Sequence, residues 1–205
     1  MREHARAGEP RKPNPASAAL PGSPPLSRWV QAHLPLALPG HRALDLACGS
    51  GRHALWMAQA GFDVLAVDRN EESLTQLTAR WAQSQRDPAH TGRLRTECLD
   101  LEADVWPLSA DRCGHWDLIV VTNYLYRPHL HNLPAILARG GVLIYETFAI
   151  GNADFGRPSN PDFLLESGEL DHFARRHGLE VLDFAQGYVE HPKPAVTQRI
   201  CARMR

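Results

Sequence analysis

The chain has 205 residues, enough for one domain with a single well-filled core. Its 22 lysine and arginine residues are balanced by 23 acidic residues, so composition predicts no general attraction to nucleic acid or to an anionic membrane. The four cysteines form no C-x-x-C pair, which favours a reduced, cytoplasmic protein, and no apolar run reaches the roughly 18 residues that span a bilayer. The histidines fall almost singly, and no metal site is expected.

The N-terminal segment is rich in proline amid alanine, glycine, arginine and serine. It offers too little apolar surface to order itself, so we predict a disordered tail over residues 1–25 and one domain over residues 26–205. A short helix is expected over residues 27–34, because Pro35 would stop it.

From Arg42 onwards, apolar segments alternate with segments of helical spacing. Strands are expected over residues 43–47, 63–67, 93–99, 117–122, 142–147, 179–184 and 197–202. Helices are expected over residues 52–60, from the cap at Asn70 through Trp81, and over residues 133–138 and 168–177. Apolar strands separated by helices predict a parallel sheet covered on both faces, which is a doubly wound α/β fold.

A glycine-rich turn follows the first strand of this pattern. Gly49 and Gly51 permit a left-handed backbone and close approach of a ligand, at the sheet edge where such folds bind ligands. A P-loop would need Lys-Ser or Lys-Thr after the glycines, whereas Arg52 and His53 stand there. A dinucleotide fingerprint tolerates this spacing, but the Asp45 carboxylate would repel a pyrophosphate and attract an ammonium group. The turn therefore predicts a cationic ligand.

Two further acids follow the next two strands. Asp68 suits a ribose diol, since a carboxylate accepts from two hydroxyl groups at once. Asp100 can accept from the exocyclic amine of adenine, while the apolar side chain of Leu101 meets the ring. A cationic nucleoside with an amino-acid tail is S-adenosyl-L-methionine, which we predict as the cofactor.

From about Trp29 to Arg205, the chain resembles the class I S-adenosylmethionine-dependent methyltransferases. Within them it is most similar to small bacterial enzymes of the tellurite-resistance type, relatives of thiopurine methyltransferase. The stretches that carry the resemblance are LDLACGSGRHA, VLAVD, LDLE, NYLYRP and YETF with the following GRPSNPDFLLESGEL. The family implies a Rossmann-like, mostly parallel sheet of seven strands with an antiparallel last strand. Ala47, where the superfamily often has glycine, and Arg69 complete the expected cofactor-binding residues together with Asn123.

The methyl acceptor should be held by the loops after the fourth and fifth strands. The stretch TNYLYRP lacks the Asn/Asp-Pro-Pro-aromatic tetrad of amino-group methylators, so methylation of an adenine or glutamine amide nitrogen is not expected. Tyr124 is predicted to face the transferred methyl group or to pack above the sheet. Arg127 is predicted to grip an anionic acceptor, with a purely structural role as the alternative. Glu146 is predicted to act as general base or acceptor anchor, or to hydrogen-bond the loop.

The loop after the fifth strand is long and rich in glycine, proline and asparagine, which is typical of a lid or an acceptor-binding loop. Phe155, Arg157 and Asn160 are its candidates for contact with the substrate. Cys48 is expected to pack rather than to react, and His53 to pack at the start of its helix.

These observations predict an enzyme that moves a methyl group from S-adenosyl-L-methionine to a small-molecule acceptor, such as a thiol, a chalcogen oxyanion or a related metabolite. One alternative is an RNA or protein methyltransferase, which would need a basic, exposed rim. Others are a nicotinamide-dependent dehydrogenase, which Asp45 opposes, and a non-catalytic S-adenosylmethionine-binding protein. No nucleic-acid or membrane partner is expected, and the oligomeric state stays open.

Overall fold

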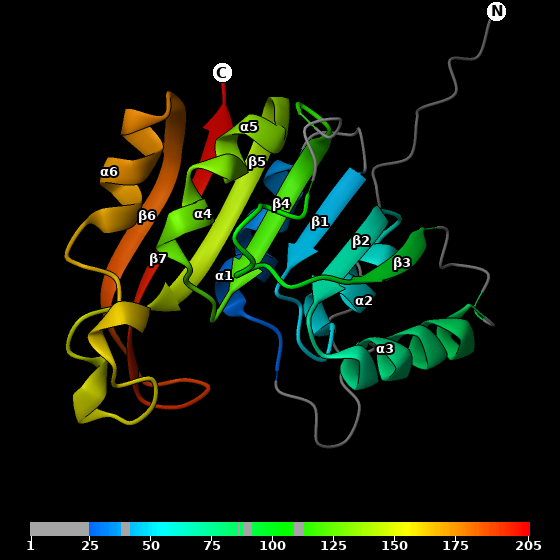
Figure 1. Ribbon diagram of the computed structural model, residues 1–205, viewed down its shortest axis with the longest axis horizontal. Helices are drawn as coiled ribbons and strands as arrows, with labels where there is room; N and C mark the ends of the chain where they lie inside the picture. Colours follow the sequence, from blue (N-terminus) through cyan, green and yellow to red (C-terminus); the bar gives the residue numbers. More distant parts are fainter. Residues whose placement is uncertain (1–24, 38–41, 86, 88–91, 109–112) are drawn as a thin grey trace, which may run out of the picture.

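The computed structural model describes residues 25–37, 42–85, 87, 92–108 and 113–205, so the tail expected before Pro25 lies outside the described residues. Seven strands form one sheet in the order β3-β2-β1-β4-β5-β7-β6 (Figure 1). Their bounds are β1 Arg42–Leu46, β2 Asp63–Asp68, β3 Arg93–Cys98, β4 Trp116–Thr122, β5 Leu137–Phe148, β6 Leu179–Val189 and β7 Ala195–Met204. Strands β1 to β5 pair in parallel, whereas β7 is antiparallel to both β5 and β6. The predicted fold class is confirmed.

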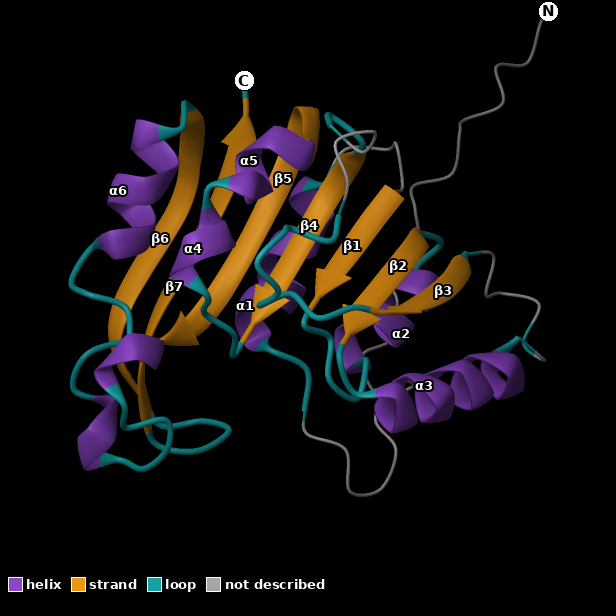
Figure 2. Ribbon diagram, viewed as in Figure 1, coloured by secondary structure: helices purple, strands orange, loops and turns teal. Residues whose placement is uncertain are grey.

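Helices cover both faces of the sheet (Figure 2). One apolar cluster joins the sheet to α1 (Arg28–His33), α2 (Arg52–Gln59) and α3 (Glu71–Ser84). A second cluster joins the opposite face to α4 (Arg127–Leu130), α5 (Asn132–Ile136) and α6 (Glu169–Arg176). Short 3-10 turns, η2 (Leu34–Leu36), η4 (Asn152–Asp154) and η5 (Pro161–Phe163), complete the described helical segments.

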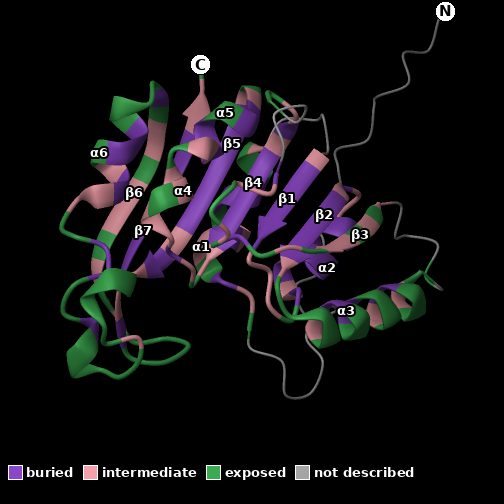
Figure 3. Cartoon of the chain, viewed as in Figure 1, coloured by how far each residue is buried: buried purple, intermediate pink, exposed green. Residues whose placement is uncertain are grey.

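Burial follows the position of each strand in the sheet. Strands β1, β2 and β4 are buried along most of their length, whereas the edge strands β3 and β6 are largely half-buried or exposed (Figure 3). A strand that is covered on both faces must be apolar throughout, which explains the uniform apolar runs that predicted β1, β2 and β4.

Local signals fix the ends of the helices, and the cap at Asn70 forms as predicted. Asn70 caps α3 by accepting a hydrogen bond from the Ser73 N–H at 2.9 Å, and Gly61 adopts a left-handed φ of 98° after α2. Ser27 caps α1 in the same way, with its hydroxyl accepting from two backbone N–H groups. Pro35 ends α1 but stands within η2, so the chain tightens into a 3-10 turn instead of leaving the helical path at once.

The predicted helix over residues 133–138 is too long. Helix α5 ends at Ile136, and Leu137 already pairs with Trp116 of β4 as the first residue of β5. A register irregularity follows before Leu118 pairs with Val142, so the chain returns to the sheet earlier than the predicted strand start at residue 142. Helical spacing over so few residues does not separate a short helix from an incoming strand.

The last two strands are longer than predicted. β6 and β7 pair from Leu179 with Met204 through to Val189 with Ala195, which extends the hairpin to the lower edge of the sheet in Figure 1. The loop after β5 lies at that same edge, and Phe155 of this loop stacks on Tyr188 of β6 with 5.1 Å between ring centroids. Two segments far apart in the sequence therefore meet where the parallel strands end.

Candidate active site

The turn after β1 has a strained backbone, and part of it borders open space. Ala47, Gly49 and Gly51 all have left-handed φ values, of 54°, 54° and 69°. A Cβ atom at Gly49 would meet nothing within 4 Å, whereas one at Gly51 would overlap the side chain of Leu77 on α3. Gly51 thus permits close packing of the turn on α3, and Gly49 leaves the backbone open to a ligand. The left-handed φ of Ala47 is one that glycine adopts more readily than alanine, in agreement with the glycine that the family resemblance implies at this position.

Asp68 ties the end of β2 to this turn. Its Oδ2 accepts a hydrogen bond from the Gly49 N–H at 2.8 Å, and its Oδ1 accepts from the Asn70 N–H at 2.9 Å. Each carboxylate oxygen can accept a second hydrogen bond, so both remain available to hydroxyl groups of a ligand. The predicted ribose contact is compatible with this geometry.

A small cavity of about 120 Å³ brings most of the predicted cofactor residues together, and we call it the cofactor pocket. Its lining residues are Ala47, Asp68, Arg69, Leu99, Asp100, Leu101, Glu102 and Tyr124. Asp100 accepts from the Glu102 N–H through Oδ1 at 2.9 Å, and no hydrogen bond from another described residue engages its Oδ2. Among the described residues, nothing hydrogen-bonds the buried hydroxyl of Tyr124. Asp100 therefore keeps a free carboxylate oxygen beside the cavity where a nucleoside was predicted.

The position of Asp45 corrects the sequence prediction. Its carboxylate was expected in the mouth of the turn, but it is 1% exposed and lines neither cavity. Its Oδ2 accepts from the Ala54 N–H at 2.8 Å, inside the first turn of α2. Burial raises the pKa of Asp45 to about 7, while the bond to Ala54 and the nearby Arg52 act in the opposite direction. Asp45 thus caps a helix beneath the turn rather than exposing an oxygen to a ligand.

A much larger cavity, of about 1340 Å³, adjoins the cofactor pocket, and we call it the acceptor cavity. Asn123 lines it, and the next residue, Tyr124, lines the cofactor pocket. Asn123 has a left-handed φ of 56°, and its N–H donates to the Glu146 carbonyl at 2.9 Å. The sharp turn after β4 therefore forms the wall between the two cavities.

Glu146 lines the acceptor cavity at the carboxyl end of β5. The Ser27 hydroxyl donates to its Oε2 at 3.1 Å, and burial raises the pKa of the Glu146 carboxyl group. The Ser27 N–H donates to Nε2 of buried His53 at 3.1 Å, so the proton of a neutral imidazole lies on Nδ1. Burial and the adjacent Arg52 lower the pKa of His53 to about 3, which keeps the ring neutral. His53 packs at the helix start, as predicted.

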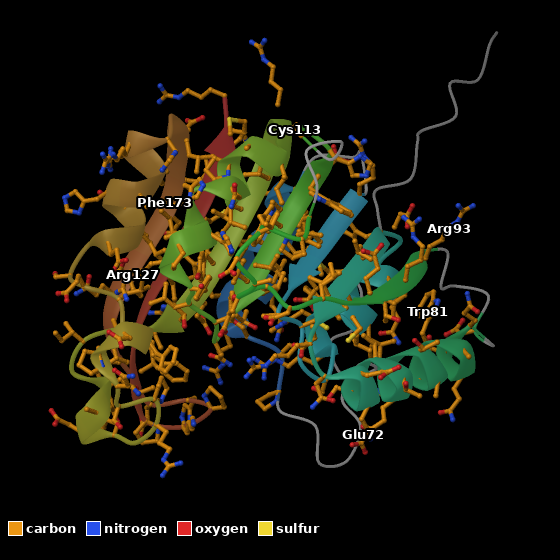
Figure 4. All side chains as sticks on the ribbon, in the orientation of Figure 1. Glu72, Trp81, Arg93, Cys113, Arg127 and Phe173 are labelled. Atoms are coloured by element: carbon orange, nitrogen blue, oxygen red, sulfur yellow. The ribbon has the colours of Figure 1, made fainter. Side chains whose placement is uncertain are left out.

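Arg127 forms several hydrogen bonds with other residues of the chain. Its Nε and Nη2 both donate to the Glu169 carboxylate at 2.8 Å, and it also donates to the carbonyls of Asp162 and Leu164. It lies by the start of α6 in Figure 4 and lines neither cavity. The structure therefore favours its structural alternative over the predicted grip on an acceptor, because these four hydrogen bonds would have to break first.

The loop after β5 contributes part of the expected set. Arg157 and Asn160 line the acceptor cavity, whereas Phe155 packs on Tyr188 outside it. Cys48 is half-buried and its pKa is raised by burial and by the nearby acids, which fits a packing role.

Sequence reasoning missed other cavity residues, notably Ser27, Lys193, Thr197 and Arg199. They come from the first described turn and from the last hairpin. No motif marks them, and only the length of β6 and β7 would have indicated that this hairpin reaches the site.

Metal ligation and membrane insertion find no support in the described part of the chain. It contains no group of three or more histidine, cysteine or acidic residues placed to hold a metal ion. None of its helices combines the length and the apolar character needed to cross a membrane.

The sequence matches the family model described as tellurite resistance protein TehB over residues 30–136, about half of the chain. Among solved structures, TehB from Haemophilus influenzae superposes with a TM-score of 0.67 at 22% identity, over 86% of this chain and 61% of that one. Magnesium protoporphyrin IX methyltransferase from Synechocystis PCC 6803, solved with bound SAH, superposes with a TM-score of 0.63 at 17% identity, over 86% and 78% of the two chains. These two likenesses establish the fold.

A curated relative, the tRNA U34 carboxymethyltransferase of Psychrobacter arcticus, is 32% identical over 120 residues, which is 55% of this chain and 33% of that protein. The chain thus spans about a third of this relative and less than two thirds of the Haemophilus TehB chain. The family model covers the glycine turn, Asp68, Asp100 and the turn after β4. The chain belongs to the TehB family, within the class I S-adenosylmethionine-dependent methyltransferases.

Proposed function

We propose that this chain transfers a methyl group from S-adenosyl-L-methionine to a small-molecule acceptor, such as a thiol, a chalcogen oxyanion or a related metabolite. The observation that carries the proposal is the pairing of two adjoining cavities across the turn formed by Asn123 and Tyr124. The smaller presents acids to a nucleoside, and the larger presents a carboxylate and several cations to a second molecule. A group-transfer enzyme needs such an arrangement, because its two substrates must meet in line.

The described residues fit the cofactor. Asp68 keeps free lone pairs for the ribose hydroxyl groups, and Asp100 keeps one oxygen for the adenine amine. The backbone at Gly49 lies open to a ligand, because a Cβ atom there would meet nothing within 4 Å. Leu101 gives the ring an apolar surface. Ala47 and Arg69 line the same pocket, and Asn123 separates it from the acceptor.

When bound, S-adenosyl-L-methionine supplies a methyl group already activated by positive sulfur. The residues of the chain then have to orient the acceptor, exclude water and remove a proton where the acceptor carries one. Glu146 is suited to receive that proton on its carboxylate, because burial raises its pKa and the Ser27 hydroxyl fixes its orientation. Arg52 and Arg199 counter the charge of Glu146 and limit the rise of its pKa.

A small acceptor is supported by the shape of the site. The acceptor cavity lies between β5, the loop after it and the β6–β7 hairpin, and its walls surround it in part. Related proteins act on different kinds of molecule, since one is named for a porphyrin and another for tRNA. The four cysteines are free thiols, which supports a reducing compartment such as the cytoplasm.

The test is a thermal-shift series with S-adenosylmethionine, S-adenosylhomocysteine and NAD, followed by product assays. We expect the first two ligands alone to raise the melting temperature, by an amount that grows with ligand concentration. Product assays with small thiols, selenite and bulk tRNA then separate the acceptor classes. Stabilisation by NAD alone would overturn the proposal, and methylation of tRNA alone would overturn the small-molecule part of it. Binding of the cofactor without methylation of any acceptor would favour a non-catalytic binding protein.

A further inference from the structure

The acceptor cavity carries a positive charge that the composition of the chain does not predict. Five cationic side chains line it, against the two carboxylates Glu146 and Glu190, although the whole chain has a formal net charge of −1. The cations are Arg28, Arg52, Arg157, Lys193 and Arg199. A partly enclosed cavity with this excess of one sign concentrates ligands of the opposite charge.

Two polar groups on β7 face this cavity without partners. Thr197 and Arg199 stand two residues apart, so both side chains project from the same face of the strand. Among the described residues, nothing hydrogen-bonds the Thr197 hydroxyl or Nε of Arg199, although both atoms are buried and Thr197 is only 7% exposed. Buried donors in proteins normally have partners. Because both side chains line the cavity, an oxyanion of a ligand would satisfy both groups after a small shift of the side chains that cover them.

Arg199 is also held in a fixed place. Its guanidinium lies over the ring of Trp29, 5.3 Å from the ring centroid, and its Cα is the register partner of Glu146 on β5. A cation held over an aromatic ring loses little further freedom when it binds a carboxylate. Arg199 is therefore arranged to receive an anion instead of forming a hydrogen-bonded pair inside the protein.

The acceptor cavity also has aromatic walls. Trp29, Phe148 and Phe163 line it, and Phe163 is 48% exposed, while Lys193 lies over the Phe148 ring at 5.8 Å. At about 1340 Å³ the cavity exceeds the several hundred to about 1,000 Å³ typical of small-molecule sites. A bare inorganic oxyanion would occupy only a small part of this space and would leave the aromatic walls uncovered.

The order of the strands determines how long a ligand must be to extend from Asn123 to Arg199. Asn123 follows β4, Glu146 lies near the end of β5, and Arg199 lies on β7. These three strands are consecutive in the sheet. Neighbouring strands lie about 4.8 Å apart, so Arg199 is about two strand spacings, or about 10 Å, from the wall of the cofactor pocket. A molecule that reacts near Asn123 and is held at Arg199 needs a body between its two ends.

We propose that the acceptor cavity binds an amphipathic organic anion, in which an apolar or aromatic body carries a carboxylate that is received by Arg199 and Thr197. This assignment rests on the proposed function, since it identifies the class of the methyl acceptor. It makes Arg199 a specificity-determining residue and leaves Glu146 to receive the proton of the reacting group.

The test is calorimetric titration of the S-adenosylhomocysteine-saturated protein with matched probes. The probes are 3-phenylpropanoate, its neutral analogue 3-phenylpropanamide, acetate and selenite. We expect the phenylpropanoate to bind about tenfold more tightly than the amide, which corresponds to one charge-assisted hydrogen-bond set, and more tightly than acetate or selenite. Arg199→Gln should remove the preference for the carboxylate and keep the affinities for the amide and for S-adenosylhomocysteine. The matched control Arg176→Gln, at an exposed position on α6, should change none of them.

Two further variants keep the test informative if Arg199→Gln does not fold. Arg199→Lys should retain part of the preference, and Thr197→Val should reduce it severalfold. Equal binding of the carboxylate and the amide would overturn the inference, as would acetate or selenite binding as tightly as the phenylpropanoate. Tight binding of tRNA that Arg199→Gln weakens, without any carboxylate preference, would instead identify a nucleic-acid surface. Failure of the carboxylate preference with intact S-adenosylhomocysteine binding rejects the acceptor class alone, whereas loss of cofactor binding in the wild-type chain rejects the proposed function.

Discussion

The cofactor pocket and the acceptor cavity lie side by side at one edge of the sheet, yet they are built in opposite ways. The cofactor pocket is small, about 120 Å³, and its walls come from the ends of β2 and β3 and the turns after β1 and β4. The acceptor cavity is about 1340 Å³, and its walls come from the segment before α1, the loop after β5 and the β6–β7 hairpin. The cofactor pocket is thus formed by segments that follow the parallel strands β1 to β4. The acceptor cavity is formed mainly by the N-terminal segment, the loop after β5 and the antiparallel hairpin.

The two cavities also differ in charge. Asp68, Asp100 and Glu102 face the cofactor pocket, opposed there by Arg69, whereas cations predominate in the acceptor cavity. The near-neutral composition of the chain does not reveal these two local charges, because it sums over all charged residues. Net charge therefore says little about a site when opposite charges are sorted between neighbouring cavities.

The buried acid beneath the cofactor turn provides the largest expected effect. Asp45 has a pKa of about 7 in the folded protein against 3.8 for the free side chain, so the folded state binds a proton more tightly than the unfolded state between these values. Stability should therefore fall as pH rises from about 4 to 7, and the loss should persist above pH 7. A tenfold difference in proton affinity between the two states is worth about 1.4 kcal/mol, so the total is a few kcal/mol.

Asp45→Asn keeps an acceptor for the Ala54 N–H and removes the ionisation. In urea denaturation at pH 5, 6, 7 and 8, the variant should gain stability over the wild type as pH rises. His53, with a pKa lowered to about 3, has the opposite pH dependence below pH 6.5, but both proteins contain it and the difference between them cancels it. If the stabilities of the wild type and of Asp45→Asn change with pH in parallel, Asp45 is not the source of the pH dependence.

The cofactor turn should tolerate no side chain at Gly51. Gly51→Ala adds a Cβ that overlaps Leu77 and forces alanine into a left-handed φ of 69°. The strain and the overpacking together should cost about 3 kcal/mol of unfolding free energy. Gly178→Ala is the matched control, since Gly178 has a φ of 75° but open space around it, and it should cost about 1 kcal/mol. Equal losses in the two variants would mean that α3 moves aside freely.

Asp68 should govern cofactor affinity without governing the acceptor cavity. Asp68→Ala removes both acceptors for the ribose hydroxyl groups and frees the Gly49 N–H, which should weaken S-adenosylhomocysteine binding by about 2 kcal/mol, or about thirtyfold. Calorimetry measures the change, with Asp154→Ala on the exposed loop as control. Unchanged affinity would remove the ribose assignment.

Arg127 tests how the acceptor cavity is supported. Arg127→Gln breaks the paired hydrogen bonds to Glu169 and those to two loop carbonyls, which should cost between about 1 and 2 kcal/mol because the side chains are partly exposed. Hydrogen exchange should rise over residues 160–170 and stay unchanged around Asp68. If the variant loses acceptor binding with unchanged exchange in this loop, Arg127 contacts the acceptor directly, as the sequence had indicated.

The sequence predicted most of the residues that line the cofactor pocket, because their positions follow from local rules. A residue that ends a parallel strand must lie at the ligand edge of the sheet, so Asp68 and Asp100 could be placed from strand prediction alone. Asp45 was placed wrongly, since period-two alternation within one strand does not tell whether a carboxylate faces the crevice or the helix behind it. The hydrogen bond that Asp45 accepts from the Ala54 N–H depends on how α2 packs against β1, which the sequence pattern does not show.

The acceptor cavity could not be predicted to the same degree. Its residues are adjacent only because β7 inserts antiparallel beside β5, which sets Arg199 opposite Glu146. The charge partners of Arg127 show the same limit, because Glu169 lies on a helix that contacts α4 only in the folded chain. Pairings across such distances depend on register and hairpin length, and apolar patterning leaves both open.

The smallest expected effect has the opposite sign. Ala47 holds a left-handed φ of 54°, a conformation that costs a residue with a Cβ about 1 kcal/mol or more. Ala47→Gly removes that strain but raises the entropy of the unfolded chain and removes a partly buried methyl group, so the net gain should be about 0.5 kcal/mol or less. The same change at Ala79, in the middle of α3, should instead cost about 1 kcal/mol. Chemical denaturation of the two variants measures this reversal of sign. A loss of stability in both would mean that packing of the Ala47 methyl group outweighs the backbone strain, and that the cofactor turn stores less strain than its backbone angles imply.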